Sequence, residues 1–144
     1  GFVHFNSRDN ARTPMQWDDT AHAGFTTGTP WLPVNENYRT VNAAHEAQDA
    51  DSVLSYYKQL IRLRRTNPVL LSGAYEELLK EHEQIYAFSR TEGTRCILTA
   101  VNFSTEPAVL PDGFLKGKRL IGSYADAPNT MLRPLEAVIY EEEL

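Results

Sequence analysis

The sequence changes its rhythm at Asn67-Pro68, and this change limits the folds that the chain can adopt. Between residues 51 and 66, apolar side chains recur with the spacing of an amphipathic helix. After Pro68, short runs alternate between apolar and polar residues, as half-buried strands do, with turn residues between them. We therefore predict one helix followed by several short strands, which makes a mainly β chain.

Asp51 or Ser52 is positioned to cap the predicted helix, and Pro68 cannot continue it because proline lacks an amide hydrogen. The stripe is wide, so we expect the helix to pack against a larger body. Three arginines near the helix end complement its dipole and need no other role. The residues that repeat with helical spacing are Val53, Leu54, Tyr57, Leu60, Ile61 and Arg64, with Leu63 broadening the stripe.

The second half of the chain contains six candidate strands, and alternation is clearest in residues 85–88 and 137–140. Short strands at this spacing predict an antiparallel sandwich or half-barrel. Tyr86 and Phe88 share one face of their strand, and we interpret such alternate positions as core. The strands are predicted at 74–79, 84–90, 95–103, 107–110, 118–124 and 135–141, with turn residues at 92–93, 111–113 and 127–129.

Composition excludes several classes of protein. The net charge of -5 gives no reason to expect a nucleic-acid partner. No apolar run approaches the roughly 18 residues of a membrane span, and no signal peptide opens the chain. Cys96 is the single cysteine, so no disulfide framework exists and a reducing, cytoplasmic compartment is favoured. It lies in an apolar run, and we expect it to be buried in a strand.

Residues 1 to about 50 are irregular, and their most informative part is the motif at residues 7–17. Arg8 and Arg12 carry planar donor groups that bind carboxylates or bridge sugar hydroxyls. Trp17 offers a flat apolar face against which a sugar ring stacks. These residues predict one wall of a carbohydrate-sized pocket. They do not make a complete active site.

Glycoside hydrolysis normally needs two carboxylates placed on either side of the bond. Asp18 and Asp19 are adjacent, so in an extended segment their side chains point apart, which is poor geometry for an acid and a nucleophile. Asp9 is better explained as an ion-pair partner of a neighbouring arginine. The spacing of His4, His22, His45 and His82 matches no metal motif, and no phosphate loop is present. We therefore predict no complete active site, no metal and no cofactor.

Five segments in order along the chain resemble the C-terminal third of the α-amylase superfamily of glycoside hydrolases. Within it the resemblance is to the oligo-1,6-glucosidases, dextran glucosidases and related α-glucosidases. The first eighteen residues carry the most specific part of the resemblance, whereas the strand region carries little. The segments are residues 7–18, 23–25, 30–31, 34–38 and 52–64.

The resemblance implies a retaining enzyme in which a (β/α)8 barrel precedes a C-terminal antiparallel β-sandwich. Residues 1–68 would form the end of the barrel, comprising the eighth loop region and the final helix. Residues 69–144 would form the sandwich. The catalytic carboxylates of the family lie upstream of the matched motifs, so none is assigned here, and we expect the isolated chain to be inactive.

By the same resemblance, Arg12 would bind a sugar hydroxyl in the subsite for the non-reducing glucose and pair with an upstream aspartate. Arg8 is a weaker candidate for substrate binding, since Asp9 beside it offers a structural partner. Trp17 and Trp31 are interpreted as anchors of their loops. Without the barrel, the apolar faces of the helix and loops would fold onto the sandwich, self-associate with a second copy of the chain, or be disordered.

The implied activity of the parent enzyme is hydrolysis of α-1,6 bonds in isomaltose-type oligosaccharides. Two alternatives within the family are a sucrose isomerase and a trehalose-6-phosphate hydrolase. A third alternative is a non-catalytic sandwich that binds glucan or a partner protein, which exposed aromatic residues on one sheet face would favour.

Overall fold

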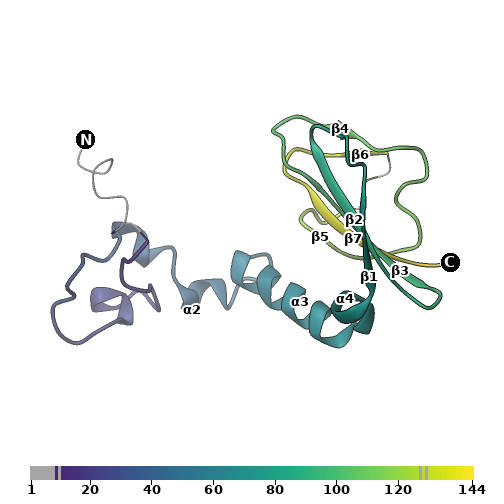
Figure 1. Ribbon diagram of the computed structural model, residues 1–144. Helices are drawn as coiled ribbons and strands as arrows, with labels where there is room; N and C mark the ends of the chain where they lie inside the picture. The colour runs from purple at the N-terminus through teal and green to yellow at the C-terminus, as the bar shows by residue number, and fades with distance from the viewer. Residues whose placement is uncertain (1–8, 10, 127, 129) are drawn as a thin grey trace. The chain divides into compact units, whose positions relative to one another are not determined.

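The computed structural model describes residues 9, 11–126, 128 and 130–144 (Figure 1). The chain divides into two compact units, Gly1–Gln59 and Leu60–Leu144. The division falls inside helix α3, Val53–Thr66, whereas the sequence places a domain boundary after residue 68. The helix therefore begins in the first unit and ends in the second.

The first unit consists mostly of loops, as the sequence predicts. Its short elements are the 3-10 helices η2 (Ala21–Gly24) and η3 (Glu36–Arg39) and the helix α2 (Ala43–Glu46). Two backbone bonds join segments distant in sequence: the Ala43 amide donates to the Gln16 carbonyl, and the Ala44 amide to the Trp17 carbonyl, both at 2.9 Å. Main-chain pairing of this kind orders a long loop that has no sheet of its own.

Helix α3 confirms the predicted helix and shows how it begins. The Ser52 hydroxyl accepts the Ser55 amide at 3.1 Å, so of the two predicted caps Ser52 is the one used. Glu46 supplies a second acceptor through its bond from the Leu54 amide at 3.1 Å. These two side chains satisfy amides at the helix start that have no partner within the helix.

Pro68 ends α3 and also begins a helix that the sequence analysis missed. Helix α4 spans Pro68–Ser72, and the Asn67 side chain caps it by accepting the Val69 amide at 3.2 Å. A proline is favoured at the first position of a helix because its missing amide hydrogen would have no partner there. The interpretation of Asn67-Pro68 as a stop alone was therefore incomplete.

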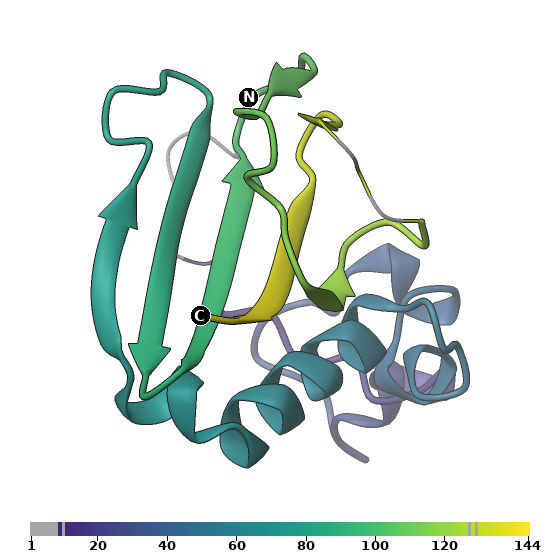
Figure 2. The ribbon, with the colours of Figure 1, turned by 90° about the vertical axis from the view of Figure 1, so that its right-hand side faces the viewer.

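The second unit is built on a five-stranded antiparallel sheet in the order β1-β2-β3-β7-β5 (Figure 2). A separate pair, β4-β6, completes the sandwich. All six predicted strands are confirmed, whereas the two-residue β6 was missed. The strands are β1 Ala74–Leu78, β2 Ile85–Glu92, β3 Arg95–Asn102, β4 Ala108–Val109, β5 Lys118–Gly122, β6 Met131–Leu132 and β7 Ala137–Glu143.

Both faces of the large sheet are covered. The main core joins one face to the β4-β6 pair through Leu110 and Leu132. The other face packs Ile97 against Val69 and Leu70 of α4. Cys96 is buried in β3, as predicted. The main core contains Ile85, Ala87, Leu98, Ala100, Ala108, Leu110, Leu132, Val138 and Tyr140.

Tyr86 and Phe88 do not belong to the main core; the interpretation of the exposed Tyr86 as a core position was wrong, whereas Phe88 is half-buried. Strand β2 turns Ile85 and Ala87 toward the sandwich interior, which places the intervening aromatic residues on the opposite face. Tyr86 is 41% exposed there. The sheet thus presents aromatic side chains outside its sandwich core.

Candidate functional site

Of the two predicted substrate-binding arginines, the structure describes only Arg12. Arg8 lies outside the described residues. Arg12 has an exposed side chain, and its backbone amide donates to the Asp9 carbonyl at 3.0 Å, which forms a turn. Thr13 and Pro14 follow as the chain enters the unit, with Pro14 buried. Arg12 therefore stands at the rim of an anchored loop.

Side-chain amides hold this loop in place. Gln16 donates from Nε2 to the Asn37 Oδ1 at 3.2 Å and also to the Val41 carbonyl. Asn35 donates to the Thr13 hydroxyl at 3.4 Å. Since these bonds span more than twenty residues of sequence, they fix the loop after Arg12 against the segment around η3.

Asp18 has a structural role in the same unit. Its carboxylate accepts both the hydroxyl and the amide of Thr20, and these bonds lower the pKa of Asp18 below its usual value. The backbone approaches closely at Gly24, where a Cβ would lie 2.6 Å from the Asp18 carboxylate. An ionised carboxylate used to close a turn agrees with the argument against Asp18 and Asp19 as a catalytic pair.

A cleft of about 500 Å3 lies in the first unit, next to the arginine motif but not lined by Arg12. Apolar side chains dominate it, including Met15, Val53 and Tyr57, which are exposed. Glu46 is the single carboxylate among its lining residues and is committed to the α3 amide. The lining of this cleft therefore lacks the two carboxylates that glycoside hydrolysis requires.

Two further observations bear on ligands. The described residues contain no group of three His, Cys, Asp or Glu side chains suited to a metal ion. Trp31 is 88% exposed and Trp17 is 53% exposed, so both indoles present much of their surface to solvent. Their interpretation as loop anchors stays a prediction.

No described helix is both long and apolar enough to cross a membrane.

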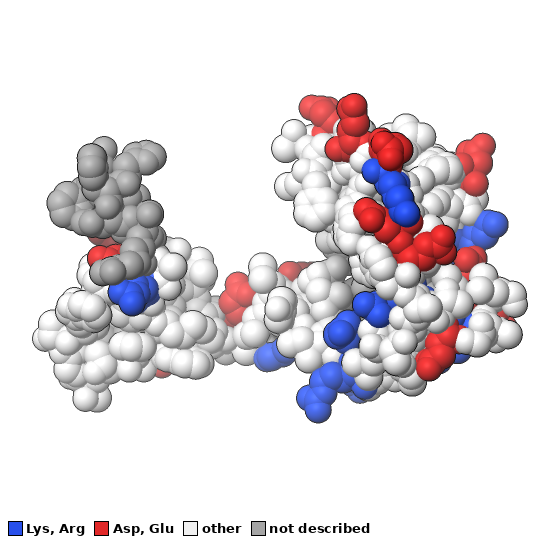
Figure 3. Space-filling view, in the orientation of Figure 1, with Lys and Arg blue, Asp and Glu red and all other residues white. Residues whose placement is uncertain are grey.

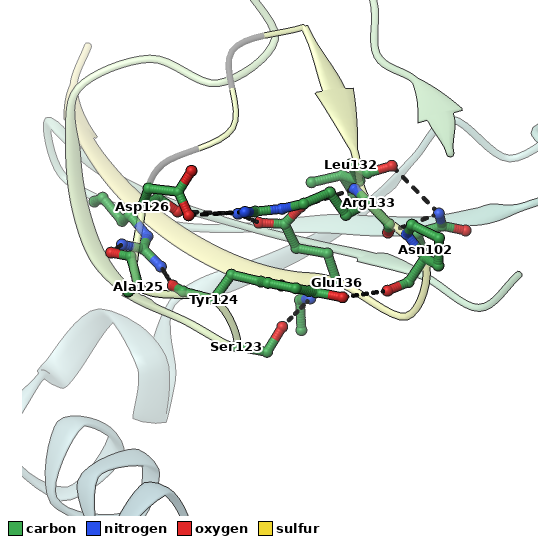
Figure 4. Close-up of polar contacts among 11 residues, drawn as sticks. Asn102, Ser123, Tyr124, Ala125, Asp126, Leu132, Arg133 and Glu136 are labelled. Carbon is green, nitrogen blue, oxygen red and sulfur yellow. Dashed lines mark hydrogen bonds and ion pairs between the residues drawn. The ribbon is translucent and has the colours of Figure 1, made fainter. Parts of the chain in front are cut away.

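The second unit holds a polar cluster that the sequence analysis did not identify (Figure 4). Arg133 pairs with the fully buried Glu136 and with Asp126, and its guanidinium lies 4.0 Å from the centre of the Tyr124 ring. Asn102 donates to the Arg133 carbonyl at 2.9 Å. On the face drawn in Figure 3, acidic side chains lie mainly over the upper part of this unit and basic side chains mainly over its lower part.

Comparison with known proteins matches the first half of the chain to a catalytic domain. The model of the family described as "Alpha amylase, catalytic domain" covers residues 2–73. Oligo-1,6-glucosidase from Bacillus cereus is 41% identical over 96% of the chain. Trehalose-6-phosphate hydrolase from Bacillus subtilis is 40% identical over 93% of it. Each match covers 26% of the relative, so the chain spans about a quarter of their length.

Solved structures confirm the fold over nearly the whole chain. The trehalulose synthase MutB from Pseudomonas mesoacidophila MX-45 matches with a TM-score of 0.83 and 44% identity, over 93% of this chain and 26% of MutB. Isomaltulose synthase from Klebsiella sp. LX3 matches with a TM-score of 0.83 and 42% identity, over 93% of this chain and 25% of that one. Other MutB crystals contain glucose or the substrate sucrose.

The loop-rich first unit, the capped helix and the sandwich together define a segment with the fold of these α-amylase-family proteins. The chain belongs to the α-amylase family. Its relatives include oligo-1,6-glucosidases, a trehalose-6-phosphate hydrolase, a trehalulose synthase and an isomaltulose synthase.

Proposed function

We propose that the chain forms the C-terminal part of a retaining α-glucosidase that hydrolyses α-1,6 bonds in isomaltose-type oligosaccharides. The observation that carries this proposal is the identity of 42% with the oligo-1,6-glucosidase of Parageobacillus thermoglucosidasius over 99% of the chain. Residues 1–68 complete the catalytic barrel, and residues 69–144 form a stabilising sandwich. The single, buried Cys96 fits a reducing, cytoplasmic setting.

Arg12 is the residue to which we assign substrate binding, with Arg8 as the second candidate. The support is its position, because Arg12 is exposed where the chain enters a loop held by long-range hydrogen bonds. A guanidinium placed in this way reaches a sugar hydroxyl without the loop having to reorganise.

The chain contributes no catalytic carboxylate in this proposal. Glu46 and Asp18 are each used to satisfy backbone amides in the first unit. The apolar cleft beside the arginine motif supports the need for a larger body, since Val53 and Tyr57 expose surface that is worth roughly 1.5–3 kcal/mol per side chain when buried.

A chimera tests the proposal. The matching quarter of the Bacillus cereus oligo-1,6-glucosidase is replaced by residues 1–144, and hydrolysis of isomaltose and of a chromogenic α-glucoside is measured. We expect turnover of isomaltose by the chimera and none by the purified 144-residue chain. Turnover by the isolated chain, lost on changing Asp9 or Asp18, would place the chemistry within it and overturn the assignment.

Sucrose conversion is the second candidate, because the MutB structure shares 44% of its aligned residues with this chain. A second chimera, in which residues 1–144 replace the matching quarter of MutB, is supplied with sucrose together with the first, so that the effect of the host is separated from that of this chain by product. Glucose and fructose indicate hydrolysis, whereas trehalulose or isomaltulose would indicate isomerisation.

A further inference from the structure

A second cleft, in the unit Leu60–Leu144, carries chemistry that the proposed α-glucosidase activity does not use. It lies on the face of the sheet opposite the main sandwich core and has a volume of about 420 Å3. This volume lies within the range of about 300–1,000 Å3 that is typical of small-molecule sites. Leu63, Leu70 and Ile139 form its apolar part.

Three aromatic rings form one wall of the cleft. The Phe88 ring lies between two tyrosines, with its centre 5.5 Å from that of Tyr75 and 5.7 Å from that of Tyr86. The planes are tilted by 35° and 46°, so the rings make a curved surface. Tyr75 is 49% exposed. Aromatic faces of this kind pack against the C–H groups of another ring.

The edge of this wall is polar. The hydroxyl groups of Tyr75 and Tyr86 are 3.0 Å apart and share a hydrogen bond. That bond raises the pKa of Tyr75 to about 12, so its phenol remains a neutral donor and acceptor. A ligand lying on the rings would thus meet hydroxyl groups at its rim.

Two guanidinium groups line the same cleft. Arg64 donates from Nη1 to the Leu70 carbonyl, and Arg90 donates from Nη1 to the Gly73 carbonyl, each at 3.0 Å. One donor holds each side chain in place, and a guanidinium has five. Arg90 is also steadied by the Tyr75 ring, 5.9 Å from its Cζ.

These two charges have no carboxylate partner in the cleft. Its lining contains Arg64 and Arg90 but no Asp or Glu, and Glu77, whose charge acts on the Tyr75 phenol, does not line it. Among the described residues, the arginines found in ion pairs are Arg95 and Arg133. Two held cations beside apolar surface and without a counter-charge favour an anionic ligand.

We propose that this cleft binds a phosphorylated sugar. The forked donors of Arg64 and Arg90 hold the phosphate, and the rings of Tyr75, Tyr86 and Phe88 cover the apolar face of the pyranose. A neutral sugar leaves both cations without a counter-charge, and a bare phosphate leaves the rings uncovered. A ligand that has both parts satisfies the whole lining.

Calorimetric titration of the 144-residue chain with glucose 6-phosphate tests the proposal, with glucose and inorganic phosphate as comparison ligands. We expect saturable binding of glucose 6-phosphate and binding at least about tenfold weaker for either comparison ligand. Arg64→Gln and Arg90→Gln should each weaken it by about tenfold or more. Arg62→Gln is the matched control, since Arg62 is an exposed arginine of the same helix outside the cleft, and should change nothing.

Arg90 also supports the backbone through Gly73, so Tyr86→Leu provides a second test of the wall. This change should weaken the binding of glucose 6-phosphate and leave the binding of inorganic phosphate unaltered. The proposal is overturned if glucose 6-phosphate fails to bind at low millimolar concentration, or if glucose or inorganic phosphate binds as tightly as glucose 6-phosphate. It is also overturned if the Arg64→Gln variant binds glucose 6-phosphate as tightly as the parent chain does. Because binding is measured without turnover, these outcomes are independent of the α-glucosidase proposal.

Discussion

The half-buried Arg133 and the fully buried Glu136 form an ion pair at the turn that leads into β7. The guanidinium Nη2 donates to Oε1 at 2.8 Å and Nε donates to Oε2 at 3.0 Å, while the Arg133 amide donates to Oε2 at 2.8 Å. The Glu136 side chain has no solvent exposure. Its own carbonyl accepts the Asn102 amide at 2.8 Å, which joins the turn to the end of β3.

Removing the Glu136 carboxylate should destabilise the sandwich strongly. Glu136→Ala leaves three donors of Arg133 without their acceptor, and because Arg133 stays partly exposed and keeps Asp126, the loss should cost about 1–3 kcal/mol. Glu136→Gln keeps the shape and one acceptor and should cost less. Urea unfolding measures the change in global stability, and hydrogen exchange measures the protection of the β7 amides.

Asp126→Asn is the matched control for this prediction, because Asp126 pairs with the same guanidinium but is 77% exposed. Its effect on stability should be much smaller than that of Glu136→Ala. Equal effects of the two changes would show that burial of Glu136 adds nothing to the pair.

The Asp126 carboxylate should make the free energy of unfolding depend on pH. The hydrogen bond from the Arg133 side chain lowers the pKa of Asp126 below its usual value of 3.8. A carboxyl whose pKa is lower in the folded state stabilises the fold above its unfolded pKa, and this contribution is lost as pH falls through the folded pKa.

The difference in unfolding free energy between the parent chain and Asp126→Asn should therefore be constant above about pH 5 and shrink below about pH 4. Chemical unfolding at a series of pH values measures it. A difference that grew on acidification would mean that the carboxylate opposes folding.

The β2-β3 hairpin shows how far local pattern determines this fold. Glu92-Gly93 is predicted as a turn, and the register pairs Glu92 with Arg95. The alternation in residues 85–88 correctly groups residues by face. It does not say which face meets the core, because that depends on where distant strands β4 and β6 lie. The interpretation of Tyr86 as a core position therefore failed.

Some signals were present but not used. Cys96, Ile97 and Leu98 form an unbroken apolar run, which indicates a strand buried on both faces, and the structure covers one face with α4. A helix on the second face was therefore to be expected. Strand β6, unlike the equally short β4, was missed because Met131 and Leu132 stand alone between Thr130 and Arg133.

Buried charge was the least predictable part of the fold and of its polar clusters. Glu136 comes immediately before an alternating strand, where a glutamate normally faces solvent. Its burial depends on Arg133 and on the register of Asn102, which no local pattern reveals. At the arginine motif, residue chemistry predicted one wall of a site, and the catalytic carboxylates could not be predicted because none is matched within the chain.

Gly117 should resist substitution more than another glycine with a positive φ. It has a φ of +78°, and a Cβ would lie 2.1 Å from the Glu141 carbonyl oxygen. Gly93 has a φ of +60° with open space around its Cβ position. Gly93→Ala should cost about 1 kcal/mol for the backbone conformation alone.

Gly117→Ala adds a backbone clash next to β5 and should cost at least about 2 kcal/mol more. Thermal unfolding of the two variants in parallel measures the difference, since the backbone term is common to both. Similar losses of stability would mean that β5 and β7 separate easily, which would contradict the tight approach at this position.

Arg12 should contribute to catalysis in the chimeric glucosidase without affecting its fold. Loss of a hydrogen bond from a charged donor to substrate costs about 1.5–3 kcal/mol, so Arg12→Ala should lower kcat/KM for isomaltose by about 10- to 100-fold. Arg12→Lys keeps the positive charge but loses the two-pronged guanidinium, so its kcat/KM should lie between those of the parent and Arg12→Ala. Circular dichroism should be unchanged because Arg12 is exposed. Full activity in Arg12→Ala would remove this residue from the substrate site and leave Arg8 as the remaining candidate.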